Sequence, residues 1–114
     1  MKGSLGDKAR LQHIYDAIVE LESYVKYESF DSFQSNSMMQ RACVTLLEII
    51  GEASNHISEA LKEVYNEIEW REIIGLRNLL IHQYFAIDTK IVWDIVHNDI
   101  PSLKSKVKEV LKQV

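Results

Sequence analysis

The sequence predicts an all-α protein, built as an antiparallel bundle of about five helices. Apolar residues recur at spacings of three and four along most of the chain, as on amphipathic helices. No segment alternates apolar and polar residues over a length that would make a strand, and one proline and four glycines leave few helix breakers. A chain of 114 residues is sufficient for one core, so we expect a single domain over residues 1–114.

The first predicted helix carries one apolar stripe and ends near Tyr27. The stripe consists of Leu11, Ile14, Tyr15, Ile18, Leu21 and Val25. Asp7 has the side chain of a helix cap and is expected to cap the first turn. Residues 28–37 are polar and are expected to form a connection that Phe30 and Phe33 hold against the core.

The second predicted helix is long, spans about residues 38–61 and lies at the centre of the bundle. Serine and asparagine at residues 35–37 are its candidate caps. Gly51 lies inside this helix, where glycine costs about 1 kcal/mol relative to alanine, so we expect another helix to approach closely there. Cys43, the single cysteine, is expected to be a small buried residue that forms no intrachain disulfide.

A polar connection over residues 63–69 leads to a third predicted helix over about residues 70–84. Ala86 and Ile87 are expected to break this helix, and Asp88 to cap the next one. The tripeptide at residues 99–101, Asp-Ile-Pro, indicates a stop and restart, because proline is tolerated in a first helical turn. The last helix then carries an apolar stripe with several lysines among its polar positions.

Charge and composition limit the classes of function. A net charge of −4 argues against a broad electrostatic grip on nucleic acid, although it leaves room for a local basic cleft. No stretch approaches the roughly 20 apolar residues of a membrane span, and the N-terminus lacks the apolar core of a signal peptide. We therefore expect a cytoplasmic protein. Histidines without ligand spacing and the absence of a glycine-rich loop predict neither a metal site nor a cofactor.

The most informative segment places four polar residues in an otherwise apolar run, at Arg77, Asn78, His82 and Tyr84. In an uninterrupted helix, Asn78 and His82 would share one face, and Arg77 and Tyr84 an adjoining one. A charged arginine in such a run is seldom buried without a partner, so we expect it to line a cleft or an interface.

These residue types suit RNA cleavage without a metal ion. Histidine can move the protons to and from the reacting oxygens near neutral pH, and arginine can hold the phosphate with two donors. Asparagine can orient either the histidine or the phosphate, and a symmetric dimer would bring two copies of these residues together. Spacing alone leaves a structural alternative open, in which the histidine caps a helix and the arginine and tyrosine form a hydrogen-bonded cluster.

The motif Arg77-Asn78-x3-His82-x-Tyr84 resembles the Arg-polar-x3-His-x-Tyr motif of HepT-like HEPN proteins. Further segments resemble the family in the same order, from about Asp7 to Leu111. They are Leu-Glu-Ile-Ile-Gly-Glu-Ala at residues 47–53, Trp-Arg-Glu-Ile-Ile-Gly at 70–75, Tyr-Phe-Ala-Ile-Asp at 84–88 with Val92-Trp93, and Asp-Ile-Pro-Ser-Leu at 99–103.

The resemblance implies a helical bundle that forms a homodimer, with the motifs of both subunits facing one cleft. It implies the toxin of a type VII toxin–antitoxin system, a metal-independent ribonuclease that acts on RNA without a cofactor. Carried over by position, Arg77 and His82 would be catalytic and Asn78 the polar companion of Arg77. The implied partner is an MntA-like nucleotidyltransferase antitoxin, which would block the site by AMPylation of Tyr84.

One position departs from the family pattern. Thr45 stands where many HepT-like relatives have a basic residue on the central helix. This departure and the acidic net charge favour an alternative, a non-catalytic HEPN module that binds a nucleotide, RNA or a partner protein. A purely structural dimer is the weakest interpretation, because it gives four polar residues in an apolar run no purpose.

Overall fold

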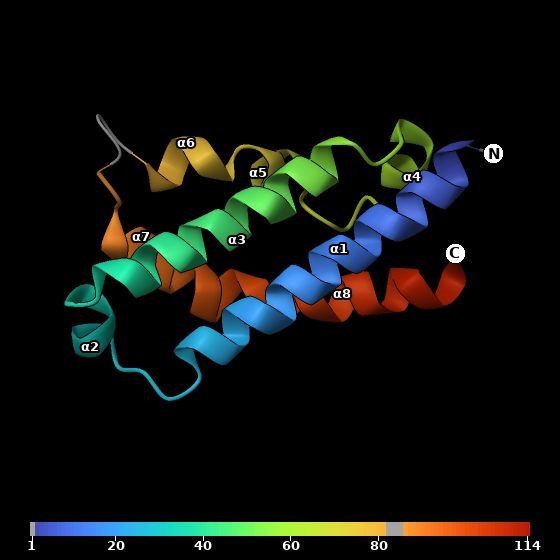
Figure 1. Cartoon of the computed structure of the whole chain (residues 1–114). Coiled ribbons are helices and arrows are strands. Elements are labelled where there is room, and N and C mark those ends of the chain that lie inside the picture. Colours follow the sequence, from blue (N-terminus) through green and yellow to red (C-terminus); the bar gives the residue numbers. More distant parts are fainter. Residues whose placement is uncertain (1, 82–85) are drawn as a thin grey trace.

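The computed structural model describes residues 2–81 and 86–114, and this part of the chain is helical, which confirms the all-α prediction (Figure 1). An isolated bridge pairs Ile81 with Ile87, and the described residues form no strand. The helices are α1 (Lys2–Val25), α2 (Phe30–Gln34), α3 (Ser37–Asn55), α4 (Glu59–Val64), α5 (Trp70–Ile74), α6 (Leu76–Leu80), α7 (Thr89–Asp94) and α8 (Ile100–Gln113), with a π-helical segment, Ile95–Asp99, between α7 and α8.

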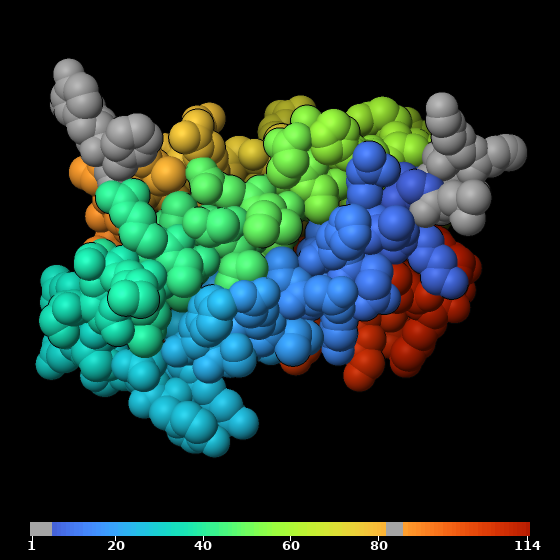
Figure 2. All heavy atoms as spheres, in the orientation of Figure 1, coloured from blue at the N-terminus to red at the C-terminus, as the bar shows by residue number. Residues whose placement is uncertain are grey.

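Three long helices form the frame of the bundle. Helix α1 packs against both α3 and α8 and runs antiparallel to both, and because α8 ends the chain, both termini lie at one end of the molecule (Figure 1). Figure 2 shows α1 and α3 side by side over one face. Helices α5 and α6 pack on α3, and α7 packs on α2, α3 and α6. None of the described helices is long and apolar enough to cross a membrane.

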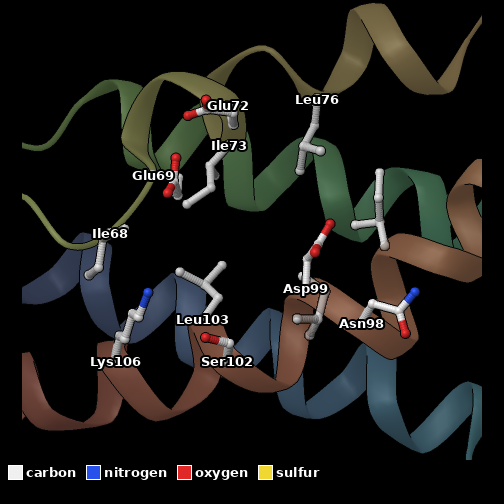
Figure 3. Close-up of a pocket in the computed structure, with 12 residues that line it drawn as sticks. Ile68, Glu69, Glu72, Ile73, Leu76, Asn98, Asp99, Ser102, Leu103 and Lys106 are labelled. Carbon is white, nitrogen blue, oxygen red and sulfur yellow. The ribbon is translucent and has the colours of Figure 1, made fainter.

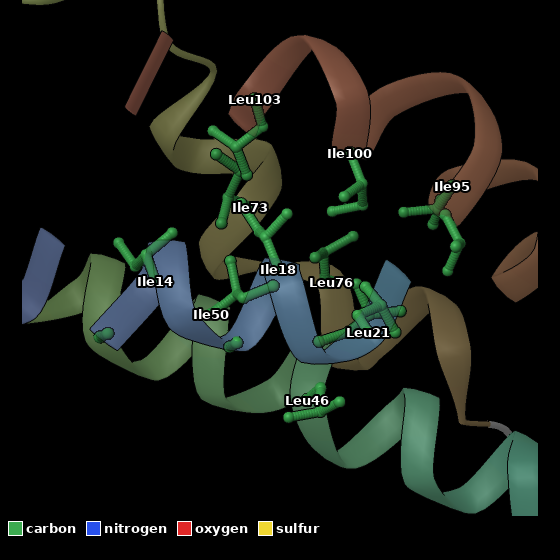
Figure 4. Close-up of a cluster of buried hydrophobic side chains, with 14 of the residues drawn as sticks. Ile14, Ile18, Leu21, Leu46, Ile50, Ile73, Leu76, Ile95, Ile100 and Leu103 are labelled. Carbon is green, nitrogen blue, oxygen red and sulfur yellow. The ribbon is translucent and has the colours of Figure 1, made fainter. Parts of the chain in front are cut away.

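The apolar stripes meet in one cluster of buried side chains between these helices (Figure 4). The predicted stripe of the first helix is buried there through Ile14, Ile18 and Leu21, which face Ile50 of α3. Full burial of each such side chain contributes about 1.5–3 kcal/mol relative to exposure. Packing of these stripes, more than helix propensity, therefore holds the short helices in place.

Asp7 does not cap the first helix, contrary to the prediction. Helix α1 begins at Lys2, and Asp7 lies inside it with a buried side chain. Its carboxylate accepts hydrogen bonds from Ser58 N at 2.8 Å and from Ser58 Oγ at 2.5 Å. Ser58 in turn caps α4 by accepting from Leu61 N at 3.3 Å. Asp7 thus ties α1 to a segment 51 residues away. The helix ends at Val25, close to the predicted Tyr27.

The connection after α1 contains the short helix α2. Ser29 and Ser32 form a capping box at its start, which satisfies two backbone N–H groups. Phe33 is buried, and Phe30 packs edge-on against Trp93 with ring centroids 5.8 Å apart. Both phenylalanines hold the connection to the core, as predicted.

The central helix is shorter than predicted. Asn36, one of the three candidate caps, accepts a hydrogen bond from Met39 N at 3.0 Å. Helix α3 then ends at Asn55 instead of continuing to residue 61, because the chain turns and Ser58 begins α4. Cys43 is buried as predicted, and burial raises the pKa of its thiol to about 11.

The predicted helix over residues 70–84 is wrong in two respects. Gly75 separates α5 from α6, and α6 ends at Leu80. Ile81 has an extended backbone, with φ −120° and ψ 122°, and Leu80 O accepts from Asp88 N at 3.0 Å. This hydrogen bond joins the end of α6 to Asp88, and the helix does not continue past Leu80. Asp88 caps α7 by accepting from Ile91 N at 3.2 Å, as predicted.

The predicted stop at residues 99–101 is also wrong. The π-helical segment Ile95–Asp99 continues directly into α8, and Ile100 keeps helical dihedrals. Pro101 has no N–H to bond the carbonyl of His97, and a π-helical turn accommodates that missing bond without ending the helix.

Candidate functional site

Arg77 lies on α6 and is held in place from α3. Its Nε–H donates to Glu48 Oε2 across 2.7 Å, and the two residues are 29 positions apart in the sequence. The Arg77 side chain is 66% exposed and that of Glu48 is 32% exposed. The bond uses one of the five N–H donors of the guanidinium, whose two Nη atoms carry the other four. Arg77 is therefore anchored through Nε, and its side chain is exposed, as expected for a residue that lines a groove.

A groove of about 520 Å³ runs between α3 and the α5–α6 segment, with Arg77 in its wall. Among the described residues that line it, Arg77 is the one cation, while Glu48 and Glu52 contribute carboxylates. Glu52 is paired with His56, whose Nε2 lies 2.9 Å from Glu52 Oε2. Thr45 is exposed and belongs to the same wall. The remaining lining residues are Leu47, Ile49, Gly51, Asn55, Ile74 and Leu76.

Gly51 sets the spacing of the two walls. A Cβ atom at this position would lie 2.9 Å from Ile73 O, a contact that real side chains essentially never make. The backbones of α3 and α5 therefore meet here, which confirms the close approach expected from a buried glycine within a helix. Glu48 is one turn before Gly51 on α3, and Arg77 follows Ile73 by four residues across the break at Gly75, so this contact lies close to both members of the ion pair.

Only part of the predicted site falls within the described residues. Asn78 follows Arg77 on α6 and is exposed, and its backbone N–H bonds Gly75 O at 3.1 Å. His82 and Tyr84 lie outside the described residues. The two predicted shared faces, of Asn78 with His82 and of Arg77 with Tyr84, require an uninterrupted helix, whereas α6 ends at Leu80.

Sequence reasoning assigned no role to Glu48, which the structure places against Arg77. A signal for it was present, since Glu48 is a charged residue inside the widest apolar stretch of the chain, one turn before the glycine. Spacing along the sequence could not say which cation it would meet. Within residues 2–81 and 86–114, no three His, Cys, Asp or Glu side chains gather as metal ligands would.

A second cavity, of about 480 Å³, lies between α5 and the start of α8 (Figure 3). Glu69, Glu72 and Asp99 stand around an apolar floor, with Lys106 at one end. Lys106 Nζ donates to Glu67 O at 3.0 Å. Among the described lining residues, this cavity has three carboxylates and one lysine, whereas the groove has two carboxylates and one arginine, so the less acidic groove is the better candidate for a nucleic-acid site.

Comparisons with known proteins match most of the chain to one family. Residues 14–110 match the family described as Ribonuclease HepT-like. A Thermococcus cleftensis protein named "Probable ribonuclease HepT" is 40% identical over 92% of this chain and 96% of its own. Proteins of Methanocaldococcus jannaschii and Caldanaerobacter subterraneus, both named "Putative RNase", are 39% and 38% identical over 90% of this chain and 94% and 92% of their own. No solved structure matches the chain.

The all-helical fold and the family match together define the class of protein, an all-α HEPN-like bundle. The match covers most of the chain, and relatives near 40% identity are aligned over nearly their full length. The chain belongs to the HepT-like ribonuclease family.

Proposed function

We propose that the chain is a metal-independent endoribonuclease and the toxin of a type VII toxin–antitoxin system. The observation that carries this proposal is the exposed Arg77, anchored through Nε at the wall of a groove of about 520 Å³. An arginine in this position can present its Nη donors to a phosphate. The names of the relatives, ribonucleases in each case, support RNA as the substrate.

In the proposed reaction, His82 takes the proton from the ribose 2′-hydroxyl, and the 2′-oxygen attacks the adjacent phosphorus. The bond to the 5′-oxygen of the next nucleotide breaks, and that oxygen receives a proton from a second acid. Arg77 binds the phosphate oxygens and stabilises the charge that develops on them. Asn78 is the polar companion that orients the phosphate or the histidine.

One chain supplies one such histidine from the motif, so we place the complete site in a homodimer. Two large apolar side chains are exposed on the helices that border the groove, which supports an interface on this part of the bundle. Ile49 of α3, which lines the groove, is 43% exposed, and Leu79 of α6 is 51% exposed. A two-fold axis over this face would bring two copies of the Arg77 wall to one cleft, and two histidines could then act as base and acid.

The proposed antitoxin is an MntA-like nucleotidyltransferase that AMPylates Tyr84. An adenylyl group adds a bulky anion to the same motif, seven residues after Arg77, where it would compete with the RNA phosphate. After incubation with this partner and ATP, we expect the toxin to gain the mass of one or more AMP units. The same gain in a Tyr84→Phe variant would reject this assignment.

The toxin proposal is tested by expression in cells, with growth and total RNA followed together. We expect growth arrest and RNA loss with the wild-type chain, and neither with Arg77→Ala or His82→Ala variants that are expressed and folded. If both variants remain toxic, the assigned residues do not form the site.

A second candidate is a non-catalytic module that binds RNA, a nucleotide or a partner in the same groove. The composition of the groove favours this candidate, because Thr45, Glu48 and Glu52 surround Arg77, the one cation among the described lining residues. Two carboxylates beside Arg77 weaken the stabilisation of the negative charge that cleavage develops on the phosphate, which favours binding without cleavage. Binding of RNA by the purified protein without any cleavage would favour this candidate.

A further inference from the structure

We propose that Glu48 is a positioning residue for Arg77, and that it orients the guanidinium for the phosphate in the reaction described above. The inference rests on the proposed ribonuclease function and adds a residue to its site. It starts from the 2.7 Å bond between Arg77 Nε and Glu48 Oε2, which joins α6 to α3 across the wall of the groove.

Helix α6 cannot fix the arginine by itself. It consists of the five residues Leu76–Leu80, with Gly75 before it and an extended residue after it. Arg77 is its second residue, and its side chain is two-thirds exposed, with many rotamers open to it in the absence of a partner. An anchor from outside α6 is therefore needed to hold the guanidinium in one direction.

Glu48 is suited to be that anchor. It lies in the middle of the 19-residue helix α3, where the backbone is rigid, and one turn from the contact of Gly51 with Ile73 O. Its side chain is about one-third exposed, so its own freedom is also restricted. A carboxylate that accepts from Nε fixes the plane of the guanidinium and leaves the end-on Nη–H donors to bind a phosphate.

The atom that Glu48 bonds shows whether Glu48 orients Arg77 for the phosphate or competes with the phosphate for its donors. A carboxylate that gripped both Nη atoms would occupy the donors that a phosphate needs, whereas Glu48 accepts from Nε. Removal of Glu48 should therefore lower the rate of cleavage instead of raising it. Because the aligned charge matters most when the phosphate becomes more negative in the transition state, kcat should fall more than KM rises.

The test measures steady-state cleavage of a defined RNA by the purified full chain in EDTA. We expect Glu48→Ala to lower kcat about 10- to 100-fold, the range for a misplaced catalytic group, with KM changed less than about 3-fold. Glu48→Gln keeps an acceptor for Nε–H and should recover much of this loss.

Glu22→Ala is the matched control. Glu22 accepts from Lys104 Nζ at 2.8 Å across α1 and α8, and its side chain, at 34%, is as exposed as that of Glu48. This ion pair lies outside the Arg77 groove, so the variant should cleave at the wild-type rate.

A double variant tests whether Glu48 acts through Arg77. If it does, Glu48→Ala has no further effect on an Arg77→Ala background, whereas an independent structural role gives additive losses. Wild-type kinetics for Glu48→Ala, a faster reaction, or additive losses would each overturn the positioning role while leaving the ribonuclease in place. No cleavage by the wild-type protein would overturn both proposals.

Discussion

Gly51→Ala tests whether the contact between α3 and α5 organises the groove. The new Cβ would lie 2.9 Å from Ile73 O, whereas ordinary contacts begin at 3.4 Å. Because the opposing atom belongs to the backbone, α5 must move by about 0.5 Å to restore an ordinary contact. Overpacking of this kind costs about 1–3 kcal/mol, and the higher helix propensity of alanine offsets about 1 kcal/mol of it.

We therefore expect Gly51→Ala to lower the free energy of unfolding by about 1 kcal/mol and to slow RNA cleavage, because α6 moves with α5. Gly75→Ala is the matched control. Its Cβ would lie 3.4 Å from Arg71 O, an ordinary contact, and the backbone φ of −86° suits any residue. This variant should be as stable as the wild type or more so.

The assay is urea unfolding followed by circular dichroism, at one protein concentration so that any dimerisation contributes equally to all variants. A Gly51→Ala protein that is about 1 kcal/mol more stable than the wild type would show that helix propensity acts without opposition. That result would refute the argument that the two backbones are in contact at this position.

Further predictions concern two buried side chains, Asp7 and Cys43. Asp7→Ala should lower the free energy of unfolding, measured in urea, by about 2–3 kcal/mol, because Ser58 N–H and Oγ lose their acceptor. A loss below about 0.5 kcal/mol would contradict the buried hydrogen bonds. Cys43 should react with a thiol reagent at pH 8 at least about 100-fold more slowly in the folded protein than in urea, because its pKa of about 11 leaves little thiolate. Because the pKa of Cys43 is raised, the stability contributed by its protonated thiol is complete below about pH 9 and is lost as the pH rises through about 11. The free energy of unfolding should therefore fall between these two pH values.

The apolar periodicity of the sequence was sufficient to predict the all-α fold and the stripes that meet in the core. Residue type also predicted caps correctly where the signal is local, at Asn36 and Asp88. These residues bond backbone groups three positions away, a distance over which sequence patterns carry information.

The same periodicity concealed two helix ends. Ile57 and Leu61 remain buried beyond the end of α3, and Leu76 and Leu80 remain buried beyond Gly75, so the apolar spacing continues across both breaks. The breaks depend on partners distant in sequence, such as Asp7 for Ser58. The pairing of Glu48 with Arg77 could not be predicted for the same reason, since it requires knowing how α5 and α6 lie on α3.

The most direct test of the proposed function is cleavage of total RNA by the purified protein in EDTA, with a folded His82→Ala variant alongside. We predict fragments from the wild-type protein and intact RNA with the variant, because the proton transfers need the imidazole and no metal ion. Intact RNA in both reactions, or equal cleavage by both proteins, would contradict a metal-independent ribonuclease built on Arg77 and His82.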